Sequence, residues 1–190
     1  MKLLLKLLVP YFTVGIFWCI VQNGWLAILA YHALVLLWDR DAWKNLRGSK
    51  PRQMLWLALP TVLVGPLLYF VLPVVSHTDL GTWLAEYKLT GWSLLLMIPY
   101  FGIIHPVMEQ LHWAPLREKT PAAHILFAGY HMLVLVSLLK MPWLIACFVT
   151  LTITSIVWQH LTRKSDSLTP AILSHILADL GIILTATLIV

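Results

Sequence analysis

Charged residues are scarce in this chain of 190 residues: only 11% are Asp, Glu, Lys or Arg, whereas 60% are hydrophobic. An ordinary soluble domain has roughly 25% charged residues. The mean hydropathy of +0.84 points the same way. This composition excludes an ordinary soluble domain. It predicts an all-α integral membrane protein, a polytopic bundle of transmembrane helices in the cell membrane.

Cysteine is scarce too, because the chain has only 2 cysteines, Cys19 and Cys147. Both lie inside apolar runs, so the sequence supports neither a disulfide framework nor a cysteine-ligated zinc site. The net charge of +5 does not indicate nucleic acid, because the basic residues cluster in short segments between apolar runs. Membrane topology explains such clusters. We therefore expect membrane lipids as partners, and no nucleic acid.

The chain also lacks a polar stretch long enough for an appended soluble domain. Its apolar runs predict about seven spans of roughly 20 residues within a single membrane domain, 1–190. The predicted spans are 3–22, 25–38, 53–73, 93–113, one beginning at 121, 142–160 and one beginning at 170. The charged segment 39–52 joins the second span to the third. The segment 80–92, rich in Trp and Tyr, is expected to lie among lipid headgroups. This segment ends the N-terminal part of the domain, 1–92, and the motif-bearing helices follow in the second part, 93–190.

The basic residues indicate the orientation of this layout. With a cytoplasmic N-terminus, 11 of the 13 Lys and Arg fall on the inner side and only Lys88 and Lys140 fall outside. Positive residues concentrate in the cytoplasmic loops of membrane proteins. We therefore predict a cytoplasmic N-terminus. We interpret the apolar run after Lys2 and Lys6 as a retained first helix, because no small-residue cleavage site follows it.

Acidic residues are rare inside the predicted spans, where we place only Glu109 and Asp179. An ionisable residue within a span costs about 2.5 to 3.5 kcal/mol on insertion scales, so it usually faces the bundle interior and serves a ligand, a pathway or chemistry. On a helix, His105, Glu109 and His112 fall within an arc of roughly 60°. His175 lies four residues before Asp179, hence on the same face. All of them are predicted in the cytoplasmic half or the middle of the membrane.

Simpler interpretations exist for each group. Glu109 could be a boundary carboxylate that reaches cytoplasmic water, and Asp179 could be a structural partner of a histidine. A lone histidine in a span is more often an interhelical hydrogen-bonding residue than a catalyst. Three histidines receive this interpretation: His32, His77 and His160. His112 and His124 lie near the predicted interface, where a wetted structural role is at least as compatible as a catalytic one.

Three short motifs follow one another along the second part of the chain. They are Glu109-Gln110, Phe127-Ala-Gly-Tyr-His131 and Pro170-Ala-Ile-Leu-Ser-His175-Ile-Leu-Ala-Asp179. Their order and predicted depth resemble the CAAX protease and bacteriocin-processing family of intramembrane glutamic proteases, also called the abortive-infection family. Its members carry Glu-Glu-x-x-x-Arg, Phe-x-x-x-His and His-x-x-x-Asn or Asp on separate helices. The second and third motifs match in full, and the resemblance covers about residues 93–190.

The first motif departs from the family pattern at two positions. Gln110 stands where the second Glu is expected, and Ala114 stands where the Arg is expected. Ala114 removes the cation that would pair with a carboxylate at the position of Gln110. Because Gln110 is uncharged, that cation is not needed, so the two departures compensate each other. The interval from Glu109 to His131 is also short for the family. We predict a folded, divergent member.

The resemblance implies peptide hydrolysis near the cytoplasmic membrane face without a metal or cofactor, on a peptide or lipidated protein substrate. By this resemblance Glu109 is the general base that deprotonates water, and His131 helps to position that water. His175 and Asp179 occupy the place of the pair that stabilises the oxyanion. An ionised Asp179 cannot donate a hydrogen bond, so we expect it to orient His175. Three residues are expected to support the site: Gln110, Phe127 and His112.

Three functions of other classes remain open at this point. The two departures in the first motif favour a non-catalytic membrane adaptor or immunity-type protein on the same fold. Histidine and carboxylate side chains also suit a zinc, iron or haem protein. Its ligands would come from His105, Glu109, His112, His124, His131 and His175. Buried acids suit a proton-coupled transporter as well, although the chain shows no internal repeat.

Overall fold

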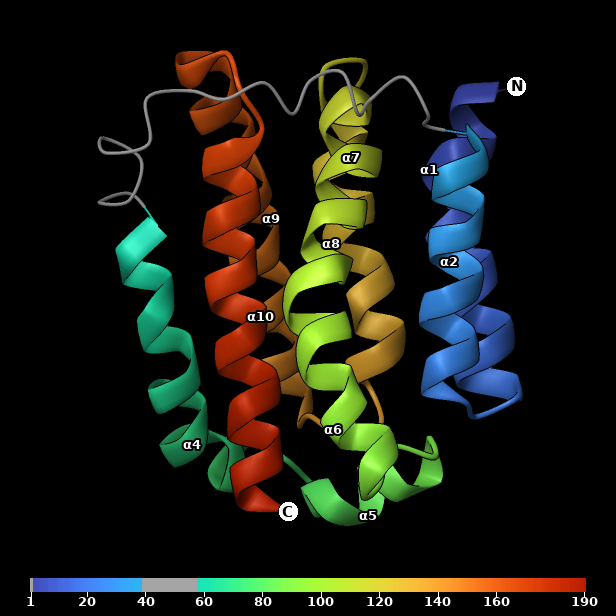
Figure 1. The fold of residues 1–190 in the computed structure, drawn as a ribbon, viewed down its shortest axis with the longest axis vertical. Coiled ribbons are helices and arrows are strands. Elements are labelled where there is room, and N and C mark those ends of the chain that lie inside the picture. Colours follow the sequence, from blue (N-terminus) through green and yellow to red (C-terminus); the bar gives the residue numbers. More distant parts are fainter. Residues whose placement is uncertain (1, 39–57) are drawn as a thin grey trace.

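The computed structural model describes residues 2–38 and 58–190. The predicted connection 39–52 and the start of the predicted third span, 53–57, lie outside the described residues. The described part is helical throughout its regular structure, apart from one isolated bridge between Ser76 and Leu139. The helices run roughly along the long axis of the molecule, and the two termini lie at opposite ends (Figure 1). The prediction of an all-α bundle is confirmed.

Nine α-helices and three short helical segments of other types make up this part of the chain. The α-helices are α1 (Lys2–Thr13), α2 (Gly24–Trp38), α4 (Val64–Val75), α5 (Leu80–Glu86), α6 (Trp92–Pro99), α7 (His105–Arg117), α8 (Ala122–Leu135), α9 (Met141–Ser165) and α10 (Thr169–Ile189). The segments Val14–Ile20 and Tyr100–Ile104 are π-helical, and Leu59–Leu63 is a 3₁₀-helix. Each segment directly adjoins an α-helix, so the chain forms longer rods.

Four of these rods are long and apolar enough to cross a membrane: Lys2–Ile20, Trp92–Arg117, Met141–Ser165 and Thr169–Ile189. Three apolar helices are shorter: Gly24–Trp38, Leu59–Val75 and Ala122–Leu135. All seven lie where the sequence predicts a span, and three continue beyond their predicted ends at 73, 113 and 160. Residues 21–23 separate the first two rods, and the Asn23-Gly24 pair at their end is typical of turns.

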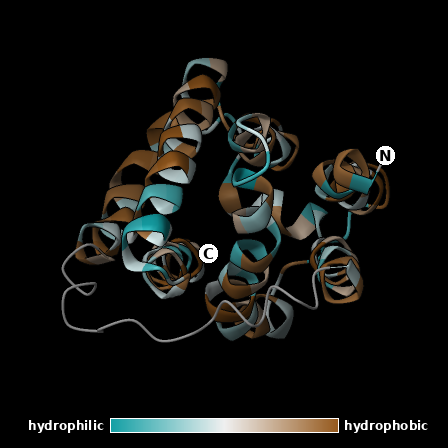
Figure 2. Cartoon of the chain, turned by 90° about the horizontal axis from the view of Figure 1, so that it is seen from above, coloured by the Kyte–Doolittle hydropathy of each residue, from teal (hydrophilic) through white to brown (hydrophobic). Residues whose placement is uncertain are grey.

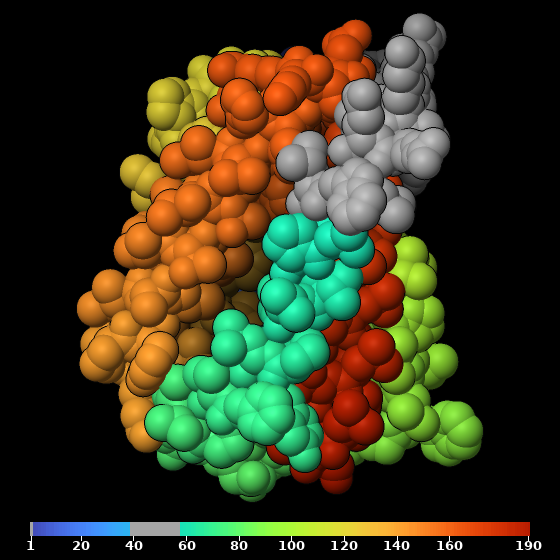
Figure 3. Space-filling view, turned by 90° about the vertical axis from the view of Figure 1, so that its left-hand side faces the viewer, coloured from blue at the N-terminus to red at the C-terminus, as the bar shows by residue number. Residues whose placement is uncertain are grey.

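The outer surface of the bundle is apolar, as a lipid-facing surface must be. Helix α9 buries only Leu144, Ser155, Trp158 and Leu161 among its 25 residues. Its exposed side carries Ile145, Val149 and Ile153. Seen from above, apolar positions dominate the helices (Figure 2). On the side formed by α4, α9 and α10 the surface is hollowed between α4 and α9, with α8 behind the hollow (Figure 3).

Helix α7 is the central helix of the bundle. Ten of its 13 residues are buried, and it packs against α2, α8 and α10. It continues the rod that begins with α6, and the π-helical segment between the two helices starts directly after Pro99. Proline lacks the backbone N–H that an α-helix needs, which favours such a change of pitch. The wider turn ends at Ile104, so the polar stretch 105–117 begins a new helical register.

Two glycines bring α4 and α10 into backbone contact. A Cβ atom added to Gly65 would lie 2.8 Å from the carbonyl oxygen of Gly181, and one added to Gly181 would lie 2.9 Å from the backbone nitrogen of Gly65. Thr185 of α10 donates a hydrogen bond of 2.9 Å to the Gly65 carbonyl. Small residues and polar hydrogen bonds of this kind hold membrane helices together.

We expect Gly65→Ala and Gly181→Ala each to destabilise the bundle by about 1 to 3 kcal/mol, because backbone atoms cannot move aside for the added methyl group. The measurement is the thermal unfolding midpoint of the purified protein in detergent. Gly15→Ala is the matched control, since a Cβ there meets nothing within 4 Å. Equal midpoints for all three variants would contradict the close α4–α10 contact.

Candidate active site

Glu109 lies at the centre of the bundle and is 0% exposed. Its Oε2 atom lies 3.4 Å from Nε2 of His175 and 3.8 Å from Nε2 of His105. The same His175 nitrogen lies 3.3 Å from Oδ2 of Asp179. Helices α7 and α10 therefore bring three of the four predicted catalytic residues together. The interpretation of Glu109 as a boundary carboxylate that reaches water is wrong, because its side chain is completely buried.

These two acids are unusual for a buried position. Within the described residues, neither oxygen of Glu109 accepts a hydrogen bond, and neither does Oδ2 of Asp179. Buried polar atoms in folded proteins nearly always have hydrogen-bond partners, so each exception calls for an explanation. His175 is the group that faces both carboxyls. The cluster therefore joins two acids across one imidazole nitrogen inside an apolar bundle.

Arg117 supplies the cation that the first motif lacks at position 114. Its Nη1 donates a hydrogen bond of 2.8 Å to Oε1 of Gln110, and its guanidinium is 3% exposed. The expectation that an uncharged Gln110 needs no cationic partner is therefore wrong. Arg117 lies seven residues after Gln110, which is two helical turns, so both side chains lie on one face of α7.

The contacts of Gln110 fix the hydrogen positions on His175. Because arginine can only donate, the oxygen of the Gln110 amide must face Arg117. The amide nitrogen, which is a donor, then faces Nδ1 of His175 at 3.3 Å. Nδ1 must be the accepting nitrogen, so a neutral His175 carries its hydrogen on Nε2, toward Glu109 and Asp179. Gln110 therefore orients His175, a role that the sequence assigned to Asp179.

The second motif lies on α8, beside this cluster. Nδ1–H of His131 donates a hydrogen bond of 2.8 Å to the backbone carbonyl of Phe127, so Nε2 is the free nitrogen of the neutral ring. His131 is half-buried and lies close enough to His175 for their charges to interact. Phe127 is fully buried and packs edge-on against Trp113 and Trp158. Phe127 thus fills the space between α7, α8 and α9.

The remaining histidines of α7 point in different directions. His105 faces Glu109 and also contacts His32 of α2, with 3.0 Å between its Nδ1 and Nε2 of His32. His112 is 1% exposed, and its Nε2 donates a hydrogen bond of 3.0 Å to the carbonyl of Lys6 in α1. A wetted role for His112 is therefore wrong. Of the predicted stripe, only His105 reaches Glu109.

A chain of hydrogen bonds runs from Arg117 to the surface through α9. Arg117 Nε donates to Ser155 Oγ at 2.9 Å, and the same oxygen lies 2.9 Å from Nδ1 of His124. Nε2 of His124 lies 3.2 Å from Oε1 of Gln159, whose amide nitrogen donates to Glu118 at 3.0 Å. His124 is therefore a buried link in a network, at 8% exposure.

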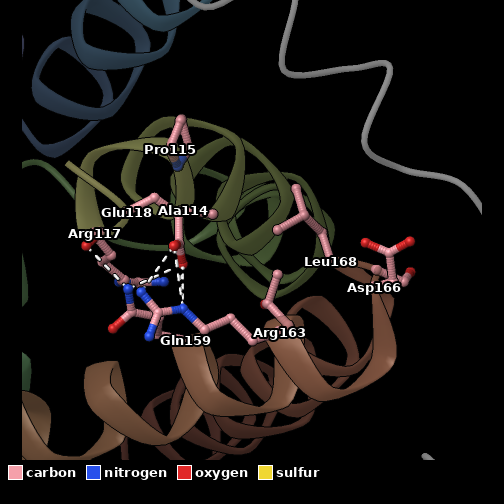
Figure 4. A pocket seen from close by; sticks show the side chains of 10 residues that line it. Ala114, Pro115, Arg117, Glu118, Gln159, Arg163, Asp166 and Leu168 are labelled. Atoms are coloured by element: carbon pink, nitrogen blue, oxygen red, sulfur yellow. Dashed lines mark hydrogen bonds and ion pairs between the residues drawn. The ribbon is translucent and has the colours of Figure 1, made fainter.

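This chain ends in a pocket of about 450 Å³ at the end of α7. Arg117, Glu118 and Gln159 line the pocket, together with Arg163 (Figure 4). Arg163 pairs with Glu118 at 2.9 Å. Its hydrogen bonds lower the pKa of the Glu118 carboxyl below the usual value. The pocket contains equal numbers of acidic and basic groups from Arg117, Glu118, Arg163 and Asp166.

Two residues of this site were missed by the sequence motifs. Arg117 could have been found from its seven-residue spacing to Gln110 at the end of an apolar run. Ser155 carries no local signal, because its partners come from α7 and α8. Among the described residues, no group of three or more His, Cys, Asp or Glu side chains is arranged to hold a metal ion. The six ligands of the metal or haem interpretation are thus not assembled.

Comparison of the chain with models of protein families, with characterised proteins and with solved structures gives no match. The function therefore has to be argued from the geometry of the buried cluster.

We expect Arg117→Leu to destabilise the protein by about 1 to 3 kcal/mol for each buried acceptor that it leaves unsatisfied, Gln110 Oε1 and Ser155 Oγ. The measurement is again the thermal unfolding midpoint. Arg163→Leu is the matched control on the exposed side of the same network, where an ion pair contributes about 0 to 1 kcal/mol. A loss for Arg163→Leu as large as that for Arg117→Leu would contradict the buried role of Arg117.

Proposed function

We propose that this protein is an intramembrane protease of the glutamic type, a divergent relative of the CAAX protease and bacteriocin-processing family. The observation that carries the proposal is the contact of Glu109 on α7 with His175 on α10, which also faces Asp179. Burying two acids in a membrane bundle is costly. A shared catalytic site accounts for that cost.

In this proposal Glu109 takes a proton from a water molecule, and the water oxygen attacks the carbonyl carbon of the peptide. The two π-electrons of the carbonyl bond move onto its oxygen. When the tetrahedral intermediate collapses, the C–N bond breaks, and the leaving nitrogen takes the proton from Glu109. The carboxyl oxygens of Glu109 accept no hydrogen bond within the described residues. Their lone pairs are therefore available for that water.

His175 is the proposed donor to the oxyanion, because its hydrogen sits on Nε2 once Gln110 holds Nδ1. A donor aimed at the developing charge in a dry site can lower the barrier by about 3 kcal/mol. Asp179 faces the same Nε2 and keeps the imidazole near the base. His131 presents its free Nε2 to the water, since Nδ1–H is used by Phe127. The proposed mechanism needs no metal or cofactor.

We also propose seven spans with a cytoplasmic N-terminus and a site in the cytoplasmic half of a cell membrane. The distribution of Lys and Arg supports this orientation. Glu109 lies eight residues before Arg117, which is about 12 Å along the helix from the basic end of its rod. A peptide or lipidated protein substrate would approach from the lipid side, where the surface is hollowed in front of α8 (Figure 3).

The test is cleavage of a fluorogenic peptide library, including prenylated peptides, by protein purified in detergent and in lipid bilayers. We expect Glu109→Gln to lower kcat/KM by at least about 100-fold, because the amide cannot accept the proton. Glu118→Gln is the matched control, since Glu118 is half-exposed and pairs only with surface groups. Activity that survives Glu109→Gln would overturn the mechanism.

One observation favours a second function, that of a non-catalytic membrane adaptor. Glu109 is 0% exposed, which fits a carboxyl group whose role is to fix the packing of α7 against α10. This function predicts no cleavage of any peptide by the wild-type protein. It also predicts that Glu109→Gln leaves the cellular phenotype intact, while substitutions on an exposed helix face abolish it. Peptide cleavage by the wild-type protein and the cellular phenotype of Glu109→Gln therefore separate the two functions.

A further inference from the structure

A second chain of polar contacts reaches Glu109 through His105. The hydroxyl group of Tyr100 lies 2.9 Å from Nδ1 of His32. Nε2 of His32 lies 3.0 Å from Nδ1 of His105, and Nε2 of His105 lies 3.8 Å from Oε2 of Glu109. The three elements involved are α2, the π-helical segment Tyr100–Ile104 and α7. Both ring nitrogens of His32 are therefore occupied.

The packing around His32 holds its ring in one orientation. His32 is 3% exposed. Its ring stacks on His105, with 5.3 Å between centroids and 23° between planes, and on Tyr100, at 5.4 Å and 25°. The two facing nitrogens, Nε2 of His32 and Nδ1 of His105, cannot both carry a hydrogen when they form a hydrogen bond between neutral rings. One ring donates and the other accepts.

When Glu109 is ionised, its charge selects which ring donates. An ionised carboxylate can only accept, so the favourable arrangement places a hydrogen on Nε2 of His105. Nδ1 of the neutral His105 is then bare and accepts from Nε2–H of His32. Nδ1 of His32 is bare in turn and accepts from the Tyr100 hydroxyl. Each donor along the chain therefore depends on the one before it, and the first donor is Tyr100.

We propose that His32 is a positioning residue for Glu109: with Tyr100 as its donor, it fixes the tautomer of His105, so that His105 directs Nε2–H toward the carboxylate. His32 touches neither Glu109 nor a substrate, and it acts only through His105. Its effect on catalysis rests on the proposed protease function, whereas its effect on the His105 tautomer does not.

Several other charged or titratable groups face Glu109 and act on it independently. They are His175 and Asp179 from α10 and Arg117 from α7, whereas His131 from α8 acts on His105. Replacement of Tyr100 or His32 leaves all of them in place. A change in His105 after such a replacement can therefore be assigned to the chain through α2.

The experiment measures imidazole tautomers by NMR in protein labelled with ¹⁵N-histidine and embedded in lipid bilayers. Protonated and bare ring nitrogens resonate far apart, and the signals are assigned by replacing each histidine singly. In the wild type we expect His105 to carry its hydrogen on Nε2. In Tyr100→Phe, His32 loses its donor, so we expect the fraction of His105 protonated on Nε2 to fall about twofold. His32→Phe, which keeps the ring shape, should have the same effect.

Two matched variants serve as controls. Tyr69→Phe removes the hydroxyl of an exposed tyrosine of α4, and His160→Phe replaces an exposed histidine of α9; neither should change the His105 signals. Unchanged His105 tautomers in both Tyr100→Phe and His32→Phe would overturn the proposal. Tyr100→Phe is small enough to keep the fold, so a misfolded His32→Phe protein would still leave a decisive variant.

Activity provides a separate readout. If the wild type cleaves peptides, we expect Tyr100→Phe and His32→Phe to lower kcat about tenfold at unchanged KM, as loss of an orienting contact does, and to alter the pH profile of kcat. A tautomer change without peptidase activity in the wild type would sustain the role of His32 and reject the protease function. Equal kcat values despite a tautomer change would show that the His105 tautomer does not position Glu109.

Discussion

The burial of the Glu109 carboxyl group is the constraint on which the rest of the site depends. Removing a carboxylate from water is expensive unless donors surround it, and the hydrocarbon core of a membrane supplies none. In this bundle two imidazoles lie next to the carboxyl group, that of His175 on α10 and that of His105 on α7. Each imidazole has its far nitrogen held by a further residue, Gln110 or His32. The acid therefore faces two imidazoles, one from α10 and one from its own helix.

The residue at position 110 determines which nitrogen of His175 carries a hydrogen. An amide offers an acceptor to Arg117 and a donor to His175 at the same time. A glutamate at this position could only accept, so Nδ1 of His175 would have to carry a hydrogen. Nε2 would then be bare, or the ring would be a cation. With the amide, a neutral His175 carries its hydrogen on Nε2, toward Glu109 and Asp179. Gln110 thus links Arg117, two turns later on α7, to His175 on α10.

The sequence predicts those features that depend on neighbouring residues. Hydrophobic runs locate the helices, Asn23-Gly24 locates a turn, and four-residue spacing places His175 and Asp179 on one face. The motif order also indicates that Glu109 meets His175, which the contact between them agrees with. The family resemblance itself and the chemistry remain predictions. What the sequence could not show depends on register and on distant partners. The π-helical turn after Pro99 shifts the face of His105, and His32 meets His105 across 73 positions.

The small residues of α10 and its neighbours explain how its polar side chains reach α7. Gly181 follows Asp179 by two positions and touches Gly65, so α10 packs at backbone distance against α4. In addition, a Cβ at Gly102 would lie 3.3 Å from Cα of Leu180, so α10 also packs closely against the π-helical segment before α7. Asp179 and His175 have short side chains and act only over a few ångströms. A bulkier residue at Gly102 would therefore move them away from Glu109. The close packing of α10 and the geometry of the polar cluster both depend on the contacts at Gly181 and Gly102.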